Sequence, residues 1–300
     1  MAPDGPRAQQ RTAWLGLLLV ALLCGTVLSF AAAIRRWGPL PLASVQGRMI
    51  DHVIGTWLAI AAVFFVAAQF FLALPLLRGG RRGDQAFIPP ALTRMPGIAA
   101  VTTVAVLLVA DGMVLAMSEA AWFRLYSAPP AGALQIDVRG RQFTWVFRYP
   151  GPDGRLGRTD PRLISPSNPF GRDPADPTGA DDIVTVNDLH LPVGRPATFR
   201  ISALDVIHGF NIPSFRLKQD AVPGRLVTVW ATPDRVGTYE IACAQLCGIG
   251  HYTMRGTVTV ESPRAFAKWM ASQAAARDAG RHRVASVPVA ERAAGTPGAR

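Results

Sequence analysis

The chain has 300 residues, half of them apolar, and its formal net charge is +11. That charge is uneven: residues 1–132 carry +5, residues 133–262 carry +1 and residues 263–300 carry +5. The length allows a membrane portion and one soluble domain, and the part most suited to fold in water is almost neutral. We therefore expect no nucleic-acid partner, because such binding needs a basic face on the folded domain.

Three apolar stretches occupy the first 120 residues, at about residues 13–33, 53–77 and 98–117. Each approaches the roughly 20 residues that a helix needs to cross a bilayer. Four arginines and one acid lie between the second and third stretches, which predicts a cytoplasmic loop there and an outer location for everything after about residue 120. The sequence thus predicts a transmembrane helical hairpin at residues 50–120 of a multi-pass protein in a bacterial-type plasma (inner) membrane.

The first stretch, within residues 1–34, has two readings. Arg7, Arg11, an apolar core and the run Ala31, Ala32 and Ala33 are typical of a signal peptide cleaved after Ala33. The same residues would also serve as an uncleaved first transmembrane helix. The prediction is therefore two or three N-terminal transmembrane helices, and both readings leave the following domain outside.

From about residue 134 the pattern changes to short β-rich runs. Apolar and polar residues alternate at 134–139 and 143–149, and further runs lie at 183–186, 197–201, 226–230, 237–241 and 257–260. Gly, Pro, Asn and Asp separate these runs, which favours an antiparallel sandwich or barrel over residues 133–262. Residues 150–182 lack periodicity and predict an insertion loop. Residues 263–300 predict a short helix, with one side formed by Phe266, Trp269 and Met270, and then a disordered basic tail.

Four side chains that bind metals lie within twelve residues: Cys243, Cys247, His251 and Met254. Thiolate, imidazole and thioether groups suit copper better than they suit hard ions such as Mg²⁺. A fifth candidate, His208, lies upstream in the strand-like run 206–210. A single blue-copper centre needs one thiolate, so the second cysteine predicts two ions bridged by thiolates, which would make an electron-transfer site. A disulfide between the two cysteines is the structural alternative.

Together these motifs resemble those of cytochrome c oxidase subunit II. The resemblance rests on C-x-x-x-C-x-x-x-H-x-x-M at 243–254, V-I-H-G-F at 206–210, K-Q-D-A-V-P-G-R at 218–225 and Q-F-T-W at 142–145. It implies a cupredoxin-like β-sandwich with a binuclear copper centre, called CuA. Such a subunit accepts electrons from cytochrome c and passes them to haem in subunit I, which reduces O₂ to water. The chain alone would catalyse nothing.

The resemblance also implies a role for each ligand. Six residues would hold the two coppers: His208, Cys243, Gln245, Cys247, His251 and Met254. The two cysteines would bridge both ions and each histidine would bind one of them. The thioether of Met254 and the backbone carbonyl oxygen of Gln245 would be weak ligands.

Three positions depart from the family pattern. The family usually has Glu where this chain has Gln245, and that carboxylate helps to hold Mg²⁺ or Mn²⁺ at the boundary with subunit I. An amide is a poorer ligand for a hard cation, so this second metal is not predicted here. The Trp that receives electrons in the family is replaced by Phe143, with Trp145 two residues later, so electrons are expected to enter at Phe143 and Trp145. The family's glutamate before the last membrane helix is missing, which argues against a proton-input role.

Other classes of protein fit the pattern less well. The CuA domain of a nitrous-oxide reductase would need a large second domain, for which the chain has no room. A copper-delivery or copper-sensing protein would not need the aromatic run, and a quinol-oxidase subunit of this fold would lack the copper ligands. Because the chain has no C-x-x-C-H motif, it is expected to carry no covalent haem, and the electron donor is expected to be a separate cytochrome c or a haem domain on another subunit. The expected partners are subunit I and other oxidase subunits, cytochrome c and the lipid bilayer.

Overall fold

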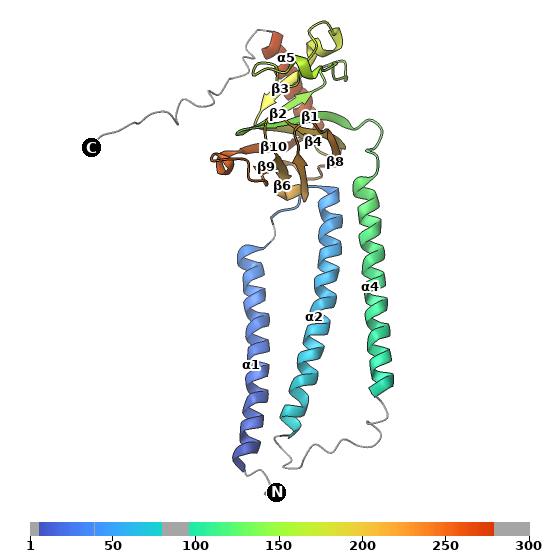
Figure 1. Cartoon of the computed structure of the whole chain (residues 1–300), viewed down its shortest axis with the longest axis vertical. Helices are drawn as coiled ribbons and strands as arrows, with labels where there is room; N and C mark the ends of the chain where they lie inside the picture. Colours follow the sequence, from blue (N-terminus) through green and yellow to red (C-terminus); the bar gives the residue numbers. More distant parts are fainter. Residues whose placement is uncertain (1–5, 39, 80–95, 279–300) are drawn as a thin grey trace, which may run out of the picture. The chain divides into compact units, whose positions relative to one another are not determined.

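The computed structural model describes residues 6–38, 40–79 and 96–278 (Figure 1). Its contacts divide the chain into two compact units, one of Met1–Leu40 with Ile50–Phe123 and the other of Pro41–Met49 with Arg124–Arg300. The predicted cytoplasmic loop between the second and third stretches falls mostly on residues 80–95, and the predicted disordered tail on residues 279–300. Both segments lie outside the described residues.

The described part of the first unit consists of three long apolar helices, except for residues 45–49 and 124–126 of two of them, which belong to the second unit. They are α1 (Pro6–Trp37), α2 (Val45–Gly79) and α4 (Pro96–Tyr126), and each is long and apolar enough to cross a membrane. A helix satisfies its own backbone groups, which is what a segment in hydrocarbon requires. The prediction of two or three helices is confirmed with three, and a helix over residues 6–37 is common to both readings of the first stretch.

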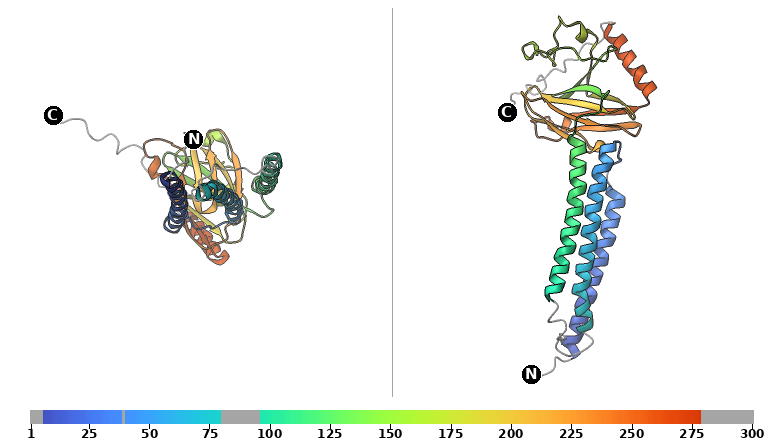
Figure 2. Two further views of the ribbon diagram at one scale, coloured as in Figure 1. Left: turned by 90° about the horizontal axis from the view of Figure 1, so that it is seen from below. Right: turned by 90° about the vertical axis from the view of Figure 1, so that its right-hand side faces the viewer.

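The second unit is a sandwich of two five-stranded sheets (Figure 2). The first sheet has the order β3-β2-β1-β5-β8, formed by Ile183–Val186, Thr144–Tyr149, Leu134–Arg141, Ala197–Ala203 and Val227–Ala231. The second has the order β4-β10-β9-β6-β7, formed by Asp188–Pro192, Arg255–Glu261, Gly237–Cys243, His208–Ile212 and Leu217–Ala221. The cupredoxin-like β-sandwich expected for residues 133–262 is thus present.

The strand pairing differs from the expected antiparallel arrangement at two places. β1 pairs with β5 in parallel, with Ile136 opposite Phe199, and β10 pairs with β4 in parallel, with Val258 opposite Leu189. The other pairs are antiparallel. The sandwich is therefore mixed. In a parallel pair the partners are far apart in sequence, and no turn signal between neighbouring runs could show them.

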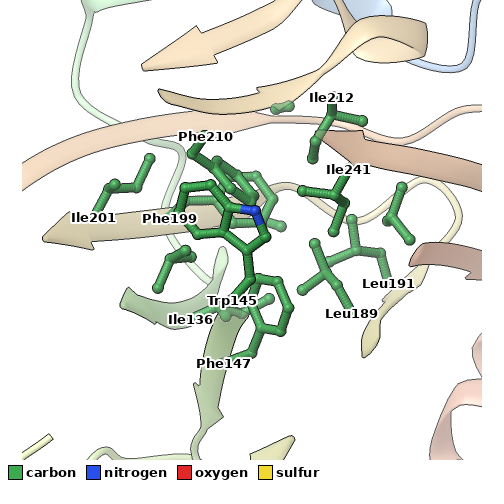
Figure 3. Packing of buried hydrophobic residues seen from close by; sticks show 14 of the residues in the cluster. Ile136, Trp145, Phe147, Leu189, Leu191, Phe199, Ile201, Phe210, Ile212 and Ile241 are labelled. Carbon is green, nitrogen blue, oxygen red and sulfur yellow. The ribbon is translucent and has the colours of Figure 1, made fainter. Parts of the chain in front are cut away.

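The core lies between the two sheets. Figure 3 shows the Trp145 indole among residues from both sheets, including Phe199 and Phe210. The Trp145 and Phe210 rings meet edge to face with centroids 5.2 Å apart. All three side chains have no exposed surface. This rigid aromatic packing directly adjoins the strand that carries His208.

Both faces of β2 are buried, although its alternating sequence predicts one solvent-facing side. The insertion at residues 150–182 covers the outer face, where Phe170 packs against the Arg148 guanidinium. Arg148 donates hydrogen bonds to Asp137, to Asp182 and to the backbone of the insertion. A buried charge with this many partners holds the insertion on the sheet, so residues 150–182 form an ordered cover rather than a free loop.

A short segment ahead of the membrane hairpin also belongs to the sandwich unit. The Ala43 amide donates to the Ser214 carbonyl, and the Ser44 hydroxyl donates to the Phe215 carbonyl. Ser44 also caps the first turn of α2 by accepting a hydrogen bond from the Gly47 amide. Residues 41–49 are therefore part of the folded unit, which the predicted boundary at residue 50 did not anticipate.

The predicted helix after the sandwich is present as α5 (Pro263–Asp278). Phe266 is buried, and Trp269 and Met270 pack against the core, so the predicted apolar side faces the sandwich. The Trp269 ring stacks flat on the His190 ring of β4, with centroids 4.2 Å apart.

Candidate metal centre

The candidate ligands lie on a loop between two paired strands. β9 ends at Cys243, a 3-10 turn spans His251–Thr253, and β10 begins at Arg255. The Cys243 amide donates to the Met254 carbonyl, which closes the loop at its base. The Ala244 amide donates to the Gly209 carbonyl and ties the loop to β6, the strand that begins with His208.

Close approach between the loop and the strands depends on two small residues. A Cβ atom at Gly209 would lie 2.8 Å from the Ala244 carbonyl carbon, and one at Gly140 would lie 2.9 Å from the His208 ring. Both distances are shorter than real Cβ contacts. Glycine at these positions therefore lets β6 and β1 pack directly against the ligand loop and the histidine ring.

Sulfur atoms form the centre of the cluster. The Cys247 Sγ lies 3.8 Å from the Cys243 Sγ, 3.7 Å from the Met254 Sδ and 3.5 Å from the His251 Nδ1. The Gln245 carbonyl oxygen lies 3.2 Å from the Cys243 Sγ. The two cysteines are free thiols. The structure thus brings together all of the predicted ligands that lie on this loop.

His208 completes the cluster from the neighbouring strand. Its ligand atom and the two cysteine sulfurs all lie within 4.8 Å of one another, and this is the one such group of three found among residues 6–38, 40–79 and 96–278. The His208 Nδ1 is buried and has no hydrogen-bond partner. A buried imidazole nitrogen without a partner is costly unless something binds it, so the residues present fit a soft metal ion.

Asp205 fixes the orientation of the His208 ring. Its Oδ1 lies 2.7 Å from the His208 Nε2, and its Oδ2 accepts a hydrogen bond from the Gln142 amide. Burial raises the pKa of Asp205, but the hydrogen bonds from Gln142, His208 and Val206 outweigh this and leave the pKa below its ordinary value. An ionised Asp205 keeps the proton on Nε2 and leaves Nδ1 free as a ligand atom.

The thiols need a cation in order to ionise together. Burial, and then the neighbouring Cys243, raise the pKa of Cys247 to about 12. At neutral pH the metal-free pair therefore keeps a proton on Cys247. A bound cation supplies the positive charge that stabilises thiolates and displaces that proton.

The two aromatic residues expected to receive electrons occupy different environments. Trp145 has no exposed surface, and its ring lies edge to face with the His208 ring at a centroid distance of 5.9 Å. A protein docked on the surface would not touch the Trp145 ring, and the prediction that electrons enter at Phe143 and Trp145 stays a prediction. Phe143 is half-buried, and its ring packs against Gly248 and Gly250 of the ligand loop.

Sequence reasoning assigned no supporting contact to two residues that hold the cluster in place. They are Asp205, described above, and Gln142, whose amide side chain donates to the Cys247 carbonyl over 2.6 Å. An Asp three residues before a candidate His ligand is a usable signal, because metal-binding histidines commonly donate their second ring nitrogen to a carboxylate. Gln142 gave no chemical signal, since its contact joins residues 105 positions apart.

Known proteins match the chain over the sandwich and over most of its length. The family model described as cytochrome c oxidase subunit II, periplasmic domain, matches residues 134–262. The alternative cytochrome c oxidase subunit 2 of Bradyrhizobium diazoefficiens is 38% identical over 264 residues, which cover 86% of this chain and 91% of that protein. The probable cytochrome c oxidase subunit 2 of Streptomyces avermitilis is 29% identical, with 89% of each chain covered.

Among solved structures, the periplasmic domain of subunit II of the Bradyrhizobium japonicum cytochrome oxidase aligns with 29% identity and a TM-score of 0.36. The alignment covers 49% of this chain and 96% of that one. The similarity to the B. diazoefficiens protein over 86% of this chain and the family match over the sandwich agree with the fold and with the cluster of soft side chains. The chain belongs to the cytochrome c oxidase subunit II family.

Proposed function

We propose that this chain is the electron-accepting subunit of a terminal haem–copper oxidase and holds two copper ions. The supporting observation is the unpartnered, buried Nδ1 of His208 beside two free thiols. One thiolate would suffice for a single copper, and a second cysteine sulfur 3.8 Å from the first supports the proposal that both thiolates would hold two ions. Six residues would hold the ions: His208, Cys243, Gln245, Cys247, His251 and Met254.

When bound, the copper pair supplies a one-electron carrier that links a donor protein to haem. The side chains and backbone of this chain hold and orient the ligand atoms. The thiolates of Cys243 and Cys247 would hold the copper ions, and Asp205 orients the His208 ring through Nε2, which leaves Nδ1 without a protein partner. The hydrogen bonds at the loop base and to β6 keep these atoms in place, which is what rapid electron transfer requires.

The same proposal covers partners and location. The proposed donor is a cytochrome c. The sequence has no haem-attachment motif, so the donor haem would lie on a separate cytochrome c or on a haem domain of another subunit. The acceptor is haem in subunit I, where O₂ is reduced to water and the reaction is coupled to proton translocation. The helices of the first unit anchor the chain in a bacterial plasma membrane and in its lipid, with the copper domain on the outer, periplasmic side.

Electron paramagnetic resonance of the full chain with copper tests this proposal. An unpaired electron shared equally by two copper nuclei of spin 3/2 gives seven hyperfine lines, and a single copper gives four. We expect seven lines, and we expect them to vanish in Cys243→Ser and in Cys247→Ser. The matched control is Cys24→Ser, which removes the free cysteine of the membrane unit and should keep all seven lines.

Four lines, or a Cys243–Cys247 disulfide without bound copper, would contradict the two-copper assignment. The full chain is required for this experiment because residues 41–49 hydrogen-bond into the sandwich. A soluble fragment that begins near residue 133 would leave the Ser214 and Phe215 carbonyls of the sandwich without these partners.

A further inference from the structure

The two sheets of the sandwich carry opposite charges. The strands of the first sheet contain four arginines and one acid, and those of the second contain four acids and two basic residues. Asp137 lies opposite both Arg148 and Arg200, and Arg139 and Arg141 follow it at alternate positions of β1. All five charged side chains of the first sheet therefore lie on its outer face. We call the surface formed by Arg139, Arg141, Arg148 and Arg200 the arginine face.

The carboxylates that contact the arginine face do not balance its charge. Asp137 is shared, because its Oδ1 accepts from the Arg200 Nε at 2.6 Å and its Oδ2 accepts from the Arg148 Nε at 2.9 Å. Asp182 of the insertion supplies a second carboxylate, which accepts from Arg148 at 3.0 Å. Two carboxylates against four arginines leave an excess of two positive charges. The charged groups next to Asp182 do not remove this excess, since they are two arginines and one acid: Arg172, Arg277 and Asp181.

Arg139 is the member of the arginine face whose charge has no acceptor. Its side chain is half-buried, its Nε is buried without a hydrogen-bond partner, and its guanidinium forms no ion pair among residues 6–38, 40–79 and 96–278. The guanidinium carbon lies over the Phe170 ring, 5.5 Å from the centroid. Burial lowers the pKa of Arg139, and the charges of Arg148 and Arg200 lower it further, although Asp137 opposes them. Because a charge removed from water is normally paired, Arg139 is suited to bind an anion from solution.

The strand register places further donor groups beside Arg139. Ser202 lies directly opposite Arg139 in the β1–β5 pair, and Thr228 lies opposite Arg200 in the β5–β8 pair. Neighbouring strands are about 4.8 Å apart, so long side chains reach across them. The Arg200 side chain is 34% exposed and uses its Nε for Asp137, and its other guanidinium nitrogens make no hydrogen bond in the part of the chain that the structure describes. Two guanidinium groups and two hydroxyl groups thus share one area of the arginine face.

The chemistry of these donors selects the kind of anion. A guanidinium group presents planar pairs of N–H donors that match the oxygens of a phosphate or carboxylate, and a hydroxyl group can donate one more hydrogen bond. A phosphate group carries a charge of about −1.5 to −2 at neutral pH, which matches the excess of two positive charges, whereas one carboxylate supplies a single charge. The ligand is also small, because Arg139 is half-buried beside Phe170 and a flat protein surface would not reach it.

We propose that Arg139 and Arg200, together with Ser202 and Thr228, form a binding site for the phosphate group of a small molecule. The site lies on the outer face of the first sheet, beside Phe170 of the insertion, and it does not depend on the function proposed above. Binding is non-covalent. A bound phosphate supplies the acceptor that Arg139 lacks and therefore stabilises the folded sandwich together with its cover.

Thermal unfolding of the full chain in detergent, titrated with inorganic phosphate at constant ionic strength, tests this site. We expect the unfolding midpoint of the wild type to rise with phosphate concentration, and Arg139→Gln to weaken the apparent affinity at least about tenfold. Arg139→Lys keeps the charge but not the planar donor pair, so its loss should be smaller. The matched control is Arg162→Gln, which removes an exposed arginine of the insertion that is paired with Asp160 and should keep the wild-type affinity.

Each variant is compared with itself in phosphate-free buffer, so a lower starting midpoint of Arg139→Gln does not affect the result. A second titration with sn-glycerol 1-phosphate distinguishes the source of the phosphate group. Tighter binding of this ester assigns the site to a phosphate carried by a larger molecule such as a lipid headgroup, and equal or weaker binding assigns it to the free ion. Two results would overturn the proposal: a wild-type midpoint that does not respond to either probe up to about 20 mM, or an Arg139→Gln response equal to that of the wild type.

Discussion

Two histidines on one sheet show how an imidazole can serve opposite purposes. His190 on β4 has a partner at each ring nitrogen: Nδ1 lies 2.8 Å from the Glu261 Oε1, and Nε2 lies 3.3 Å from the Asp188 Oδ1. His208 on β6 has Asp205 at Nε2 and no hydrogen-bond partner at Nδ1. Both strands belong to the sheet β4-β10-β9-β6-β7, so the difference lies in the side chains around each ring.

The partners of its two ring nitrogens indicate whether a histidine in a folded domain is suited to carry a charge or to bind a metal. A ring with carboxylates at both nitrogens is suited to hold two protons and to act as a cation. A ring with one carboxylate and one free nitrogen is held as a neutral tautomer whose free nitrogen can bind a metal. The first arrangement anchors α5 through the stack on Trp269, and the second completes the cluster of cysteine sulfurs.

The largest expected difference between the two histidines is in copper affinity after each imidazole ring is removed in turn. His208→Ala should weaken copper binding by more than about 100-fold, because loss of an outer-shell partner alone typically costs 10- to 100-fold. His190→Ala should keep copper affinity within a factor of about two, because the loss of one structural contact leaves the ligands in place. Titration of the full-length variants against a copper chelator of known affinity measures both. Equal losses in the two variants would show that the rings do not differ in role.

A subtler change keeps both rings and alters only their carboxylate partners. Asp205→Asn would place an NH₂ group against either the Gln142 amide or the His208 Nε2, and one of these donors would lose its acceptor. We expect about 10- to 100-fold weaker copper binding in the chelator titration. Asp188→Asn is the matched control and should leave copper affinity unchanged. Normal affinity in Asp205→Asn would mean that the ligand loop alone orients the His208 ring.

The candidate ligands could be selected from the sequence because their chemistry is local. Two thiols, an imidazole and a thioether within one loop limit the choice of metal, and the structure brings them together with His208. Most strands were also predictable, since their apolar residues alternate. β4 and β7 were missed: Asp188–Pro192 is short and ends in proline, and Leu217–Ala221 has no clear alternation.

Long-range contacts were not predictable from local patterns. The full burial of β2 depends on an insertion that folds back over its outer face, and the attachment of residues 41–49 joins positions 171 residues apart. The same holds for Trp145. Alternation showed that it lies on the same side of its strand as Phe147, but only the packing of the second sheet shows that His208 covers it.

The smallest expected effect concerns the proton on His190. Burial lowers the pKa of His190, but the hydrogen bonds and charges of Asp188 and Glu261 outweigh this and raise the pKa above its ordinary value. The protonated ring therefore stabilises the fold, and this contribution is complete below about pH 6.5, the unfolded-state pKa. It is lost as the pH rises through the higher pKa of the folded state.

Thermal unfolding of the full chain, followed by tryptophan fluorescence at several values between pH 6 and pH 9, measures this loss. We expect the unfolding midpoint of the wild type to fall more steeply with pH than that of His190→Gln, which carries no titrating ring. Glu240→Gln is the control, since Glu240 pairs with Arg255 and not with a histidine. A wild-type slope equal to that of His190→Gln would mean that His190 is neutral in the folded protein. The contrast with His208 would then rest on the metal cluster alone.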